Sequence, residues 1–263
     1  MVEIHLYLQV RNNAHTRHGG VFLHRCIMEN NAFLRTSLVI GDDNLKKLHA
    51  SSVWVFGCGG VGGFVVEALA RSGVGNITVV DMDNVDITNI NRQIIALRST
   101  VGNSKAEEMK KRCLDINPDI NFTAVQKMFC GENASEFDFG GVDYIVDAID
   151  MVTSKLLLIE MARKCGVPII SSMGTGNKTD AGSLTVSDIY KTHGDPLARV
   201  MRRELKKRGI DKLKVVYSPE KPIEQKVTEE GKSRPITASV PWVPPVAGFI
   251  IAGEVVKDIC GIK

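Results

Sequence analysis

A glycine-rich turn at residues 57–63 has the residue types needed to bind a phosphate. It reads GCGGVGG, follows the apolar residues 53–56 and precedes the amphipathic residues 64–71. Such a strand, turn and helix start lets the backbone approach a phosphate and points the free N–H groups of the helix toward it. Gly57, Gly59 and Gly62 match the pattern G-x-G-x-x-G, and Gly60 lies within it. The turn therefore predicts a nucleotide site.

An acid ends the next apolar run. Asp81 closes the predicted strand 76–81, where a carboxylate can accept hydrogen bonds from ribose hydroxyls. The same pattern occurs in NAD and FAD sites. This pattern alone therefore does not distinguish a dinucleotide from another nucleotide.

Polar and basic side chains follow this acid, and they favour a triphosphate. The candidates are Asp83, Asn89, Arg92, Gln93 and Lys105. Hydride transfer has no use for such a cluster, whereas triphosphate oxygens need donors and positive charge beside them. Taken singly, Arg92 and Lys105 have an ordinary alternative as solvated surface charges.

Two aspartates follow a later predicted strand, 142–147. Asp147 and Asp150 fall at its carboxyl end, the edge at which open α/β sheets bind ligands. A carboxylate there is a natural Mg²⁺ ligand, and Asp150 is the candidate. Its ordinary alternative is to cap the helix that follows.

The elements that position these residues alternate between strand and helix up to residue 172. We expect strands at 51–56, 76–81, 121–128, 142–147 and 167–170, and helices at 38–48, 105–116 and 155–165. This order predicts an α/β fold with a doubly wound, mostly parallel, Rossmann-like sheet. Residues 173–263 are less regular, with a short strand at 184–189, a basic helix, a polar loop at 218–235 and an apolar helix at 245–259.

The composition indicates the class of protein and its compartment. The 263 residues are 44% hydrophobic and 24% charged, with a formal net charge of +3, as in ordinary globular proteins. No apolar run reaches the roughly 18–20 residues of a membrane span. The six cysteines form no C-x-x-C pair, which disfavours a zinc ribbon and favours reduced thiols in the cytoplasm. Residues 1–27 are expected to form a poorly ordered extension of a single domain at 28–263.

Taken in order, these motifs resemble the E1-like adenylating enzymes, the ThiF, MoeB and HesA superfamily. The glycine turn is followed by D-x-D at 81–83, N-x-N-R-Q at 89–93, a helix-opening lysine and D-A-I-D at 147–150. The resemblance implies a nucleotide-binding core at about 50–172, binding of ATP with Mg²⁺, and attack of a substrate carboxylate on the α-phosphate.

The resemblance also assigns roles to residues. Asp81 holds the ribose, Asn89, Arg92 and Lys105 contact phosphates, and Asp150 binds magnesium. Arg35, before a predicted helix, matches an arginine that reaches into the partner's site, and this implies a homodimer.

Further segments resemble one branch of this family, the tRNA threonylcarbamoyladenosine dehydratases. They are 90–97, 191–198, 217–220 and 243–248. In that branch ATP activates the threonyl carboxylate of N6-threonylcarbamoyladenosine beside the anticodon, and a neighbouring group of the same modification closes a ring. No thiol relay is needed, in agreement with the absence of cysteine between Cys165 and Cys260. The branch also implies a monovalent cation, Na⁺ or K⁺, which we expect at the 173–177 loop, and a sulfur-transfer protein as a partner.

The expected basic helix, 199–214, is the candidate tRNA surface. The RNA-binding candidates are Arg199, Arg202, Arg203, Lys206 and Lys207, opposite an apolar stripe of Leu197, Val200, Met201 and Leu205. Docked by that stripe, the helix would present a cationic ridge to phosphates. The ordinary alternative is a solvated helix face.

Two other function classes stay open. One is an enzyme that adenylates the C-terminal carboxylate of a small ubiquitin-like or sulfur-carrier protein. The other is a nicotinamide dehydrogenase or a non-catalytic nucleotide-binding module.

Overall fold

The computed structural model describes residues 32–227 and 237–263. The expected extension at 1–27, and residues 228–235 of the expected polar loop, lie outside this part of the chain. The chain divides into two compact units, Met1–Asp42 and Asp43–Lys263. The first contains α3 (Leu34–Ile40), which ends at Gly41 with a backbone φ of +87°. The single helix expected at 38–48 is therefore wrong, because α4 (Asp42–Ala50) is a separate helix.

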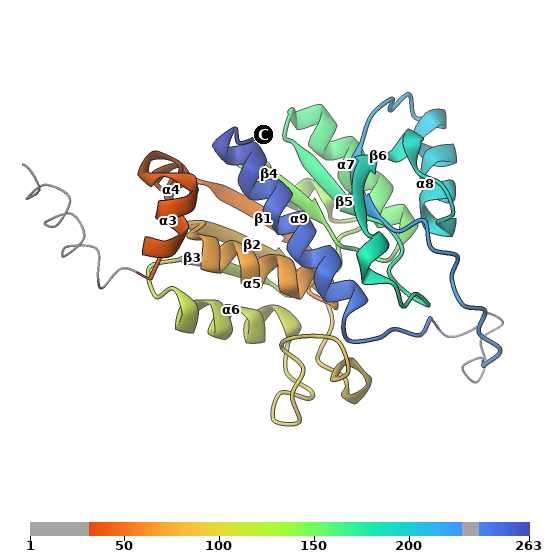
Figure 1. Ribbon diagram of the computed structural model, residues 1–263, viewed down its shortest axis with the longest axis horizontal. Helices are drawn as coiled ribbons and strands as arrows, with labels where there is room; N and C mark the ends of the chain where they lie inside the picture. The colour runs from red at the N-terminus through yellow and green to blue at the C-terminus, as the bar shows by residue number, and fades with distance from the viewer. Residues whose placement is uncertain (1–31, 228–236) are drawn as a thin grey trace, which may run out of the picture. The chain divides into compact units, whose positions relative to one another are not determined.

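The second unit is built on one seven-stranded sheet (Figure 1). The strand order is β3-β2-β1-β4-β5-β7-β6, and every neighbouring pair is parallel except β6 and β7. The expected fold class is confirmed. The strands are β1 (Ser52–Phe56), β2 (Asn76–Val80), β3 (Asn121–Val125), β4 (Tyr144–Asp147), β5 (Ile169–Ser172), β6 (Thr185–Asp188) and β7 (Lys214–Tyr217).

Helices cover both faces of this sheet (Figure 1). One face carries α5 (Gly62–Ser72), α6 (Lys105–Ile116) and α9 (Val243–Cys260); the other carries α7 (Val152–Cys165) and α8 (Pro196–Lys207). Short 3₁₀ turns complete the chain at η1 (Ile87–Asn89), η2 (Ala134–Glu136), η3 (Ala181–Ser183) and η4 (Ile189–Lys191). No helix in the described ranges is both long and apolar enough to cross a bilayer.

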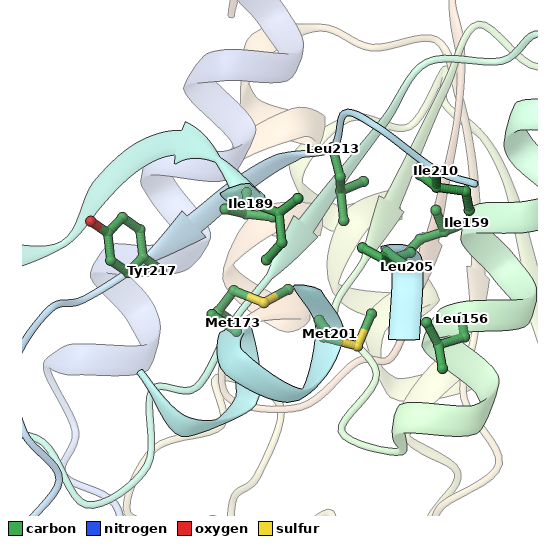
Figure 2. Packing of buried hydrophobic residues seen from close by; sticks show 11 residues of the cluster. Leu156, Ile159, Met173, Ile189, Met201, Leu205, Ile210, Leu213 and Tyr217 are labelled. Carbon is green, nitrogen blue, oxygen red and sulfur yellow. The ribbon is translucent and has the colours of Figure 1, made fainter. Parts of the chain in front are cut away.

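The face under α7 and α8 has a continuous apolar core. Figure 2 shows Met201 and Leu205 of α8 packed with Leu156 and Ile159 of α7. The stripe predicted for the basic helix is thus the face that docks α8, although Leu197 and Val200 are only partly buried. A neighbouring cluster is aromatic, with edge-on contacts among Phe56, Phe129, Phe137 and Phe139.

The direction in which the chain winds across the sheet reverses between β1 and β4. From β1 the chain winds outward through β2 and β3, and then returns to the other side of β1 at β4. The connections on the two sides diverge at this point, and ligands of open α/β sheets bind outside the carboxyl ends of the strands here. The glycine turn and Asp150 follow these two strands.

The basic segment is shorter as a helix than expected. α8 ends at Lys207, and Gly209 adopts a φ of +65°, which stops helical continuation. The chain then returns as β7, a strand that the sequence reading missed and that lies between β5 and β6. Strand β3 also ends earlier than expected, at Val125.

Candidate active site

Two glycines of the turn are required by close backbone contacts. Gly57 has a φ of +90°, and a Cβ at this position would lie 2.6 Å from the Ala148 carbonyl oxygen after β4. A Cβ at Gly62 would lie 1.8 Å from the Gly57 carbonyl oxygen. Only glycine fits at both positions. No side chain caps the N-terminus of α5, and the Gly63 and Phe64 N–H groups donate to the Gly59 and Val61 carbonyl oxygens at 3.0 and 3.1 Å. The Gly60 and Gly62 N–H groups have no acceptor among the described residues, so they are the ones open to an anion.

Asp81 is held at the edge of the glycine turn. Its carboxylate accepts hydrogen bonds from the Cys58 N–H at 2.6 Å and the Asp83 N–H at 2.8 Å. Burial raises the pKa of the Asp81 carboxyl, while the two N–H donors and the nearby Lys105 ammonium act against this rise. The two N–H donors fix the carboxylate beside the turn, where a ribose would lie.

Lys105 opens α6 and lies beside the same acid. Its side chain is 7% exposed, and its Nζ lies 2.8 Å from Asp83 Oδ2. The Lys105 N–H also donates to the Asp83 carbonyl oxygen at 3.0 Å. The structure thus brings Lys105 together with Asp83 of the predicted cluster, and the contact of Lys105 with phosphates stays a prediction. The Asp83 side chain is 50% exposed, so the carboxylate partner is partly solvated although Lys105 itself is buried.

The segment after η1 covers the glycine turn. Asn89 closes a capping box with Asp86, in which its Oδ1 accepts from the Asp86 N–H at 3.0 Å. Arg92 lies over Gly60, with its Cγ 3.4 Å from the position of a Cβ there. Its Nη1 donates to the Thr88 carbonyl oxygen at 3.0 Å. Arg92 thus lies against the glycine turn, whereas the Asn89 side-chain oxygen is used in the capping box with Asp86; their contacts with phosphates stay a prediction.

Gln93 supplies a test of whether this site fits a ligand. It is 7% exposed, its amide lies 3.7 Å from a Cβ position at Gly59, and its Oε1 is buried without a hydrogen-bond partner in the described part of the chain. Ser239 Oγ is also buried without a hydrogen-bond partner among the described residues. The Ser239 carbonyl oxygen accepts a hydrogen bond from the Asn91 side chain at 2.9 Å. Buried polar groups are normally paired. The Gln93 side chain lies beside the glycine turn, and a bound nucleotide would supply a partner for its oxygen there. Ser239 carried no sequence signal.

The two aspartates after β4 have different surroundings. Asp147 is fully buried, accepts from the Ser171 hydroxyl and pairs with Lys155 Nζ at 2.9 Å. The Asp147 oxygens are taken up inside the fold, so Asp150 remains the candidate metal ligand of the two. Asp150 is exposed, and α7 begins after Met151 without a side-chain cap. The capping alternative for Asp150 is therefore excluded.

Within the described ranges, no group of three or more acidic, histidine or cysteine side chains could hold a metal. Mg²⁺ commonly binds through one or two carboxylates together with substrate phosphates and water. Asp150, which is exposed and follows β4 at the same edge of the sheet as the glycine turn, fits such an arrangement. Arg35 is exposed on α3 of the first unit, and its predicted role across a dimer interface stays a prediction.

Cysteine chemistry at this site is disfavoured. Cys58, inside the glycine turn, is buried, and burial raises the pKa of its thiol well above the ordinary value. Burial likewise raises the pKa of Cys113 to about 12. A thiol with such a pKa stays protonated and is a poor nucleophile.

The segments 174–178, 193–195 and 218–220 meet at the carboxyl end of β5. Asp195 Oδ1 accepts from the Ala198 N–H at 2.7 Å and so caps α8. Gly194 has a φ of +74°, and a Cβ there would lie 2.3 Å from the Pro219 carbonyl oxygen. Glu220 accepts from the Thr179 and Asp180 N–H groups at 2.9 and 3.0 Å. Two of the four branch-like segments, 191–198 and 217–220, thus meet the 174–178 loop in one hydrogen-bonded cluster at the start of α8.

The candidate RNA side chains on α8 differ in how free they are. Glu204 pairs with Arg203, Lys207 and Arg208 at 3.1, 2.9 and 3.1 Å. Arg202 donates to the carbonyl and hydroxyl oxygens of Thr192. Arg199 and Lys206 are exposed and form no ion pair with the described residues. The expected ridge is therefore partly neutralised, and Arg199 and Lys206 are its freest cations.

Comparison with known proteins decides the family. The ThiF family model matches residues 33–263. This chain belongs to the ThiF family. It is 45% identical over 238 residues to a tRNA threonylcarbamoyladenosine dehydratase of Bacillus subtilis, covering 86% of this chain and 94% of the relative. A crystal structure of the Escherichia coli tRNA N6-threonylcarbamoyladenosine dehydratase TcdA in complex with ATP superposes with a TM-score of 0.81. That match has 34% identity and covers 88% of this chain and 94% of TcdA.

A different ThiF-family relative matches less of the chain. The adenylyltransferase and sulfurtransferase UBA4 of Saccharomyces cerevisiae is 34% identical over 140 residues, covering 53% of this chain and 31% of UBA4. The dehydratase match therefore extends through the C-terminal elements, whereas the match to UBA4 spans about half of the chain.

Proposed function

We propose that this ThiF-family protein is an ATP-dependent tRNA threonylcarbamoyladenosine dehydratase. It activates the threonyl carboxylate of N6-threonylcarbamoyladenosine next to the anticodon, and a neighbouring group of the same modification closes a ring with net loss of one water. The observation that carries the proposal is the similarity to enzymes of that name along nearly the whole of both chains.

The site residues support each part of this reaction. ATP, bound with Mg²⁺, would activate the substrate carboxylate, which attacks the α-phosphate of ATP. Asp81 orients the ribose, while the uncapped start of α5, Arg92 and Lys105 provide donors and positive charge for the phosphates. Asp150 is the protein ligand for Mg²⁺. Groups already positioned in this way stabilise developing charge without reorganising during the reaction.

Attack within a single bound nucleotide explains why no thiol is needed. An intramolecular attack of good geometry gains roughly 7–11 kcal/mol over one between separate molecules. The high pKa of Cys58 agrees with a reaction that forms no thioester. The resemblance also implied a monovalent cation at the 173–177 loop; we leave it out because the Lys178 ammonium occupies the described oxygens there.

The decisive test uses ATP, Mg²⁺ and tRNA that carries threonylcarbamoyladenosine. The digested nucleoside should lose the mass of one water only when ATP and protein are both present.

The second candidate function is adenylation of a small carrier protein, which the match to UBA4 favours. ATP–pyrophosphate exchange stimulated by such a carrier and not by tRNA would replace our proposal with this one.

We further propose a homodimer in which Arg35 serves the partner's site. Mixing Arg35→Ala with Asp150→Ala protein should restore activity, because a mixed dimer then holds one complete site. Mixtures as inactive as the separate variants would refute shared sites. A sulfur-transfer partner and a cytoplasmic location remain predictions.

A further inference from the structure

Three oxygen atoms from three separate segments surround the Lys178 ammonium. Its Nζ lies 2.6 Å from Asp195 Oδ2, 2.8 Å from the Gly174 carbonyl oxygen and 3.0 Å from the Ser218 carbonyl oxygen. The Lys178 side chain is 1% exposed, and that of Asp195 is 0% exposed. A buried charge is tolerated when it is paired and its donors are satisfied, as here.

This oxygen set is one that a hard monovalent cation would use. The loop that contributes the Gly174 oxygen is the loop at which the family resemblance implied Na⁺ or K⁺. We infer that Lys178 is the resident cation of this site, and that the protein therefore requires no metal cation at the 173–177 loop. A second positive charge could not share these oxygens, because like charges at such distances in a buried site repel strongly.

The ammonium has a structural task that follows from its partners. Asp195 uses Oδ1 to cap α8 and Oδ2 to hold Lys178, so one carboxylate joins the helix to the loop after β5. Ser218, which follows β7, adds the third segment. The glycine at 174 is tightly placed, since a Cβ there would lie 3.0 Å from Asp195 Oδ2. Lys178 is accordingly a positioning residue for the start of α8, not a catalytic residue.

The experiment is thermal unfolding in NaCl, KCl and tetramethylammonium chloride at equal ionic strength. Tetramethylammonium is too large to enter the site. The unmodified protein should have the same Tm in all three salts. A higher Tm in KCl or NaCl than in tetramethylammonium chloride would overturn the inference, whatever the variants do.

Two variants of Lys178 test the oxygen site itself. Lys178→Ala opens space beside the three oxygens, so K⁺, Na⁺ or methylammonium should raise its Tm by about 3–5 °C per tenfold gain in folding equilibrium. Lys178→Met fills the space with an apolar chain of similar length and should show no such gain. A folded Lys178→Ala protein that is indifferent to every small cation would contradict the inference. Should this variant not fold, the unmodified protein still decides the question.

Discussion

Lys105 and Lys155 are both buried lysines paired with aspartate, but their partners differ in exposure. Asp83, the partner of Lys105, is 50% exposed, whereas Asp147, the partner of Lys155, is 0% exposed. Lys155 also donates to the Ile149 and Ser172 carbonyl oxygens at 3.0 and 2.9 Å. The first pair lies partly in solvent at the candidate nucleotide site, while the second holds the ends of β4 and β5 together. We propose that the same two residue types serve a ligand in one place and the fold in the other.

Removing Lys155 tests the structural side of this difference. Lys155→Ala leaves the Asp147 carboxylate buried without its partner, and breaking such a pair costs about 3–5 kcal/mol. We expect that loss in the free energy of unfolding, measured by urea denaturation. Lys105→Ala, whose partner stays solvated, should cost no more than about 1 kcal/mol. Equal losses in the two variants would show that partner exposure does not separate the pairs.

Substitutions at the candidate nucleotide site should lower activity strongly and stability little. Three alanine variants each remove a side chain that we propose contacts the phosphates or Mg²⁺: Arg92→Ala, Lys105→Ala and Asp150→Ala. Product formation on modified tRNA should fall by about 10²–10³-fold, the range for loss of one group that stabilises developing charge. Mass spectrometry of the digested tRNA measures this.

Two exposed residues of α6 serve as controls for these variants, Lys111→Ala and Asp115→Asn. Both should keep full activity. Normal activity in Arg92→Ala and Asp150→Ala would remove these residues from the site.

A smaller effect separates two neighbouring lysines of α8. Lys207 pairs with Glu204 at 2.9 Å, whereas Lys206 is exposed and forms no ion pair with the described residues. Lys206→Gln should weaken tRNA binding about threefold to tenfold and lower the salt slope by about 1, with ATP affinity unchanged. Lys207→Gln should have less effect. Fluorescence anisotropy over a salt series measures both, and identical behaviour would show that Glu204 does not screen Lys207.

The smallest effect is expected in the pH dependence of stability. Burial alone would raise the pKa of Glu67, but hydrogen bonds from Arg112 and Arg71 outweigh it and hold the pKa below its ordinary value of 4.5. A lowered folded-state pKa means that the contribution is present above the unfolded-state value and is lost as the pH falls through the folded one. Glu67→Gln should cost at most about 1 kcal/mol at neutral pH and flatten the acid limb of the stability curve. An acid limb unchanged in the variant would assign that limb to other carboxylates.

The residues that follow strand ends were predictable from sequence, and the buried charges were not. The glycine turn, Asp81, Arg92 and Asp150 stand at fixed positions after apolar runs, so the parallel sheet brings them to one edge. Lys155 and Lys178 look like any surface lysine in the sequence, because burial depends on partners from distant segments.

Local backbone conformation limited the prediction of helix and strand ends. The expected helix at 38–48 missed the positive φ of Gly41, which only the folded chain reveals. β7 is four residues long and follows a basic run that reads as a continuation of α8. Its place in the sheet comes from pairing with β5, which carries no local signal.

The insertion of β7 between β5 and β6 has a consequence during protein synthesis. Strand β6 leaves the ribosome before β7, yet among the described strands of the finished sheet its one neighbour is β7. Until Tyr217 has emerged, the outer edge of β5 is an unpaired template that a neighbouring nascent chain could join. Ribosome-bound chains that stop short of this strand should bind chaperones and aggregate more readily than chains that include it.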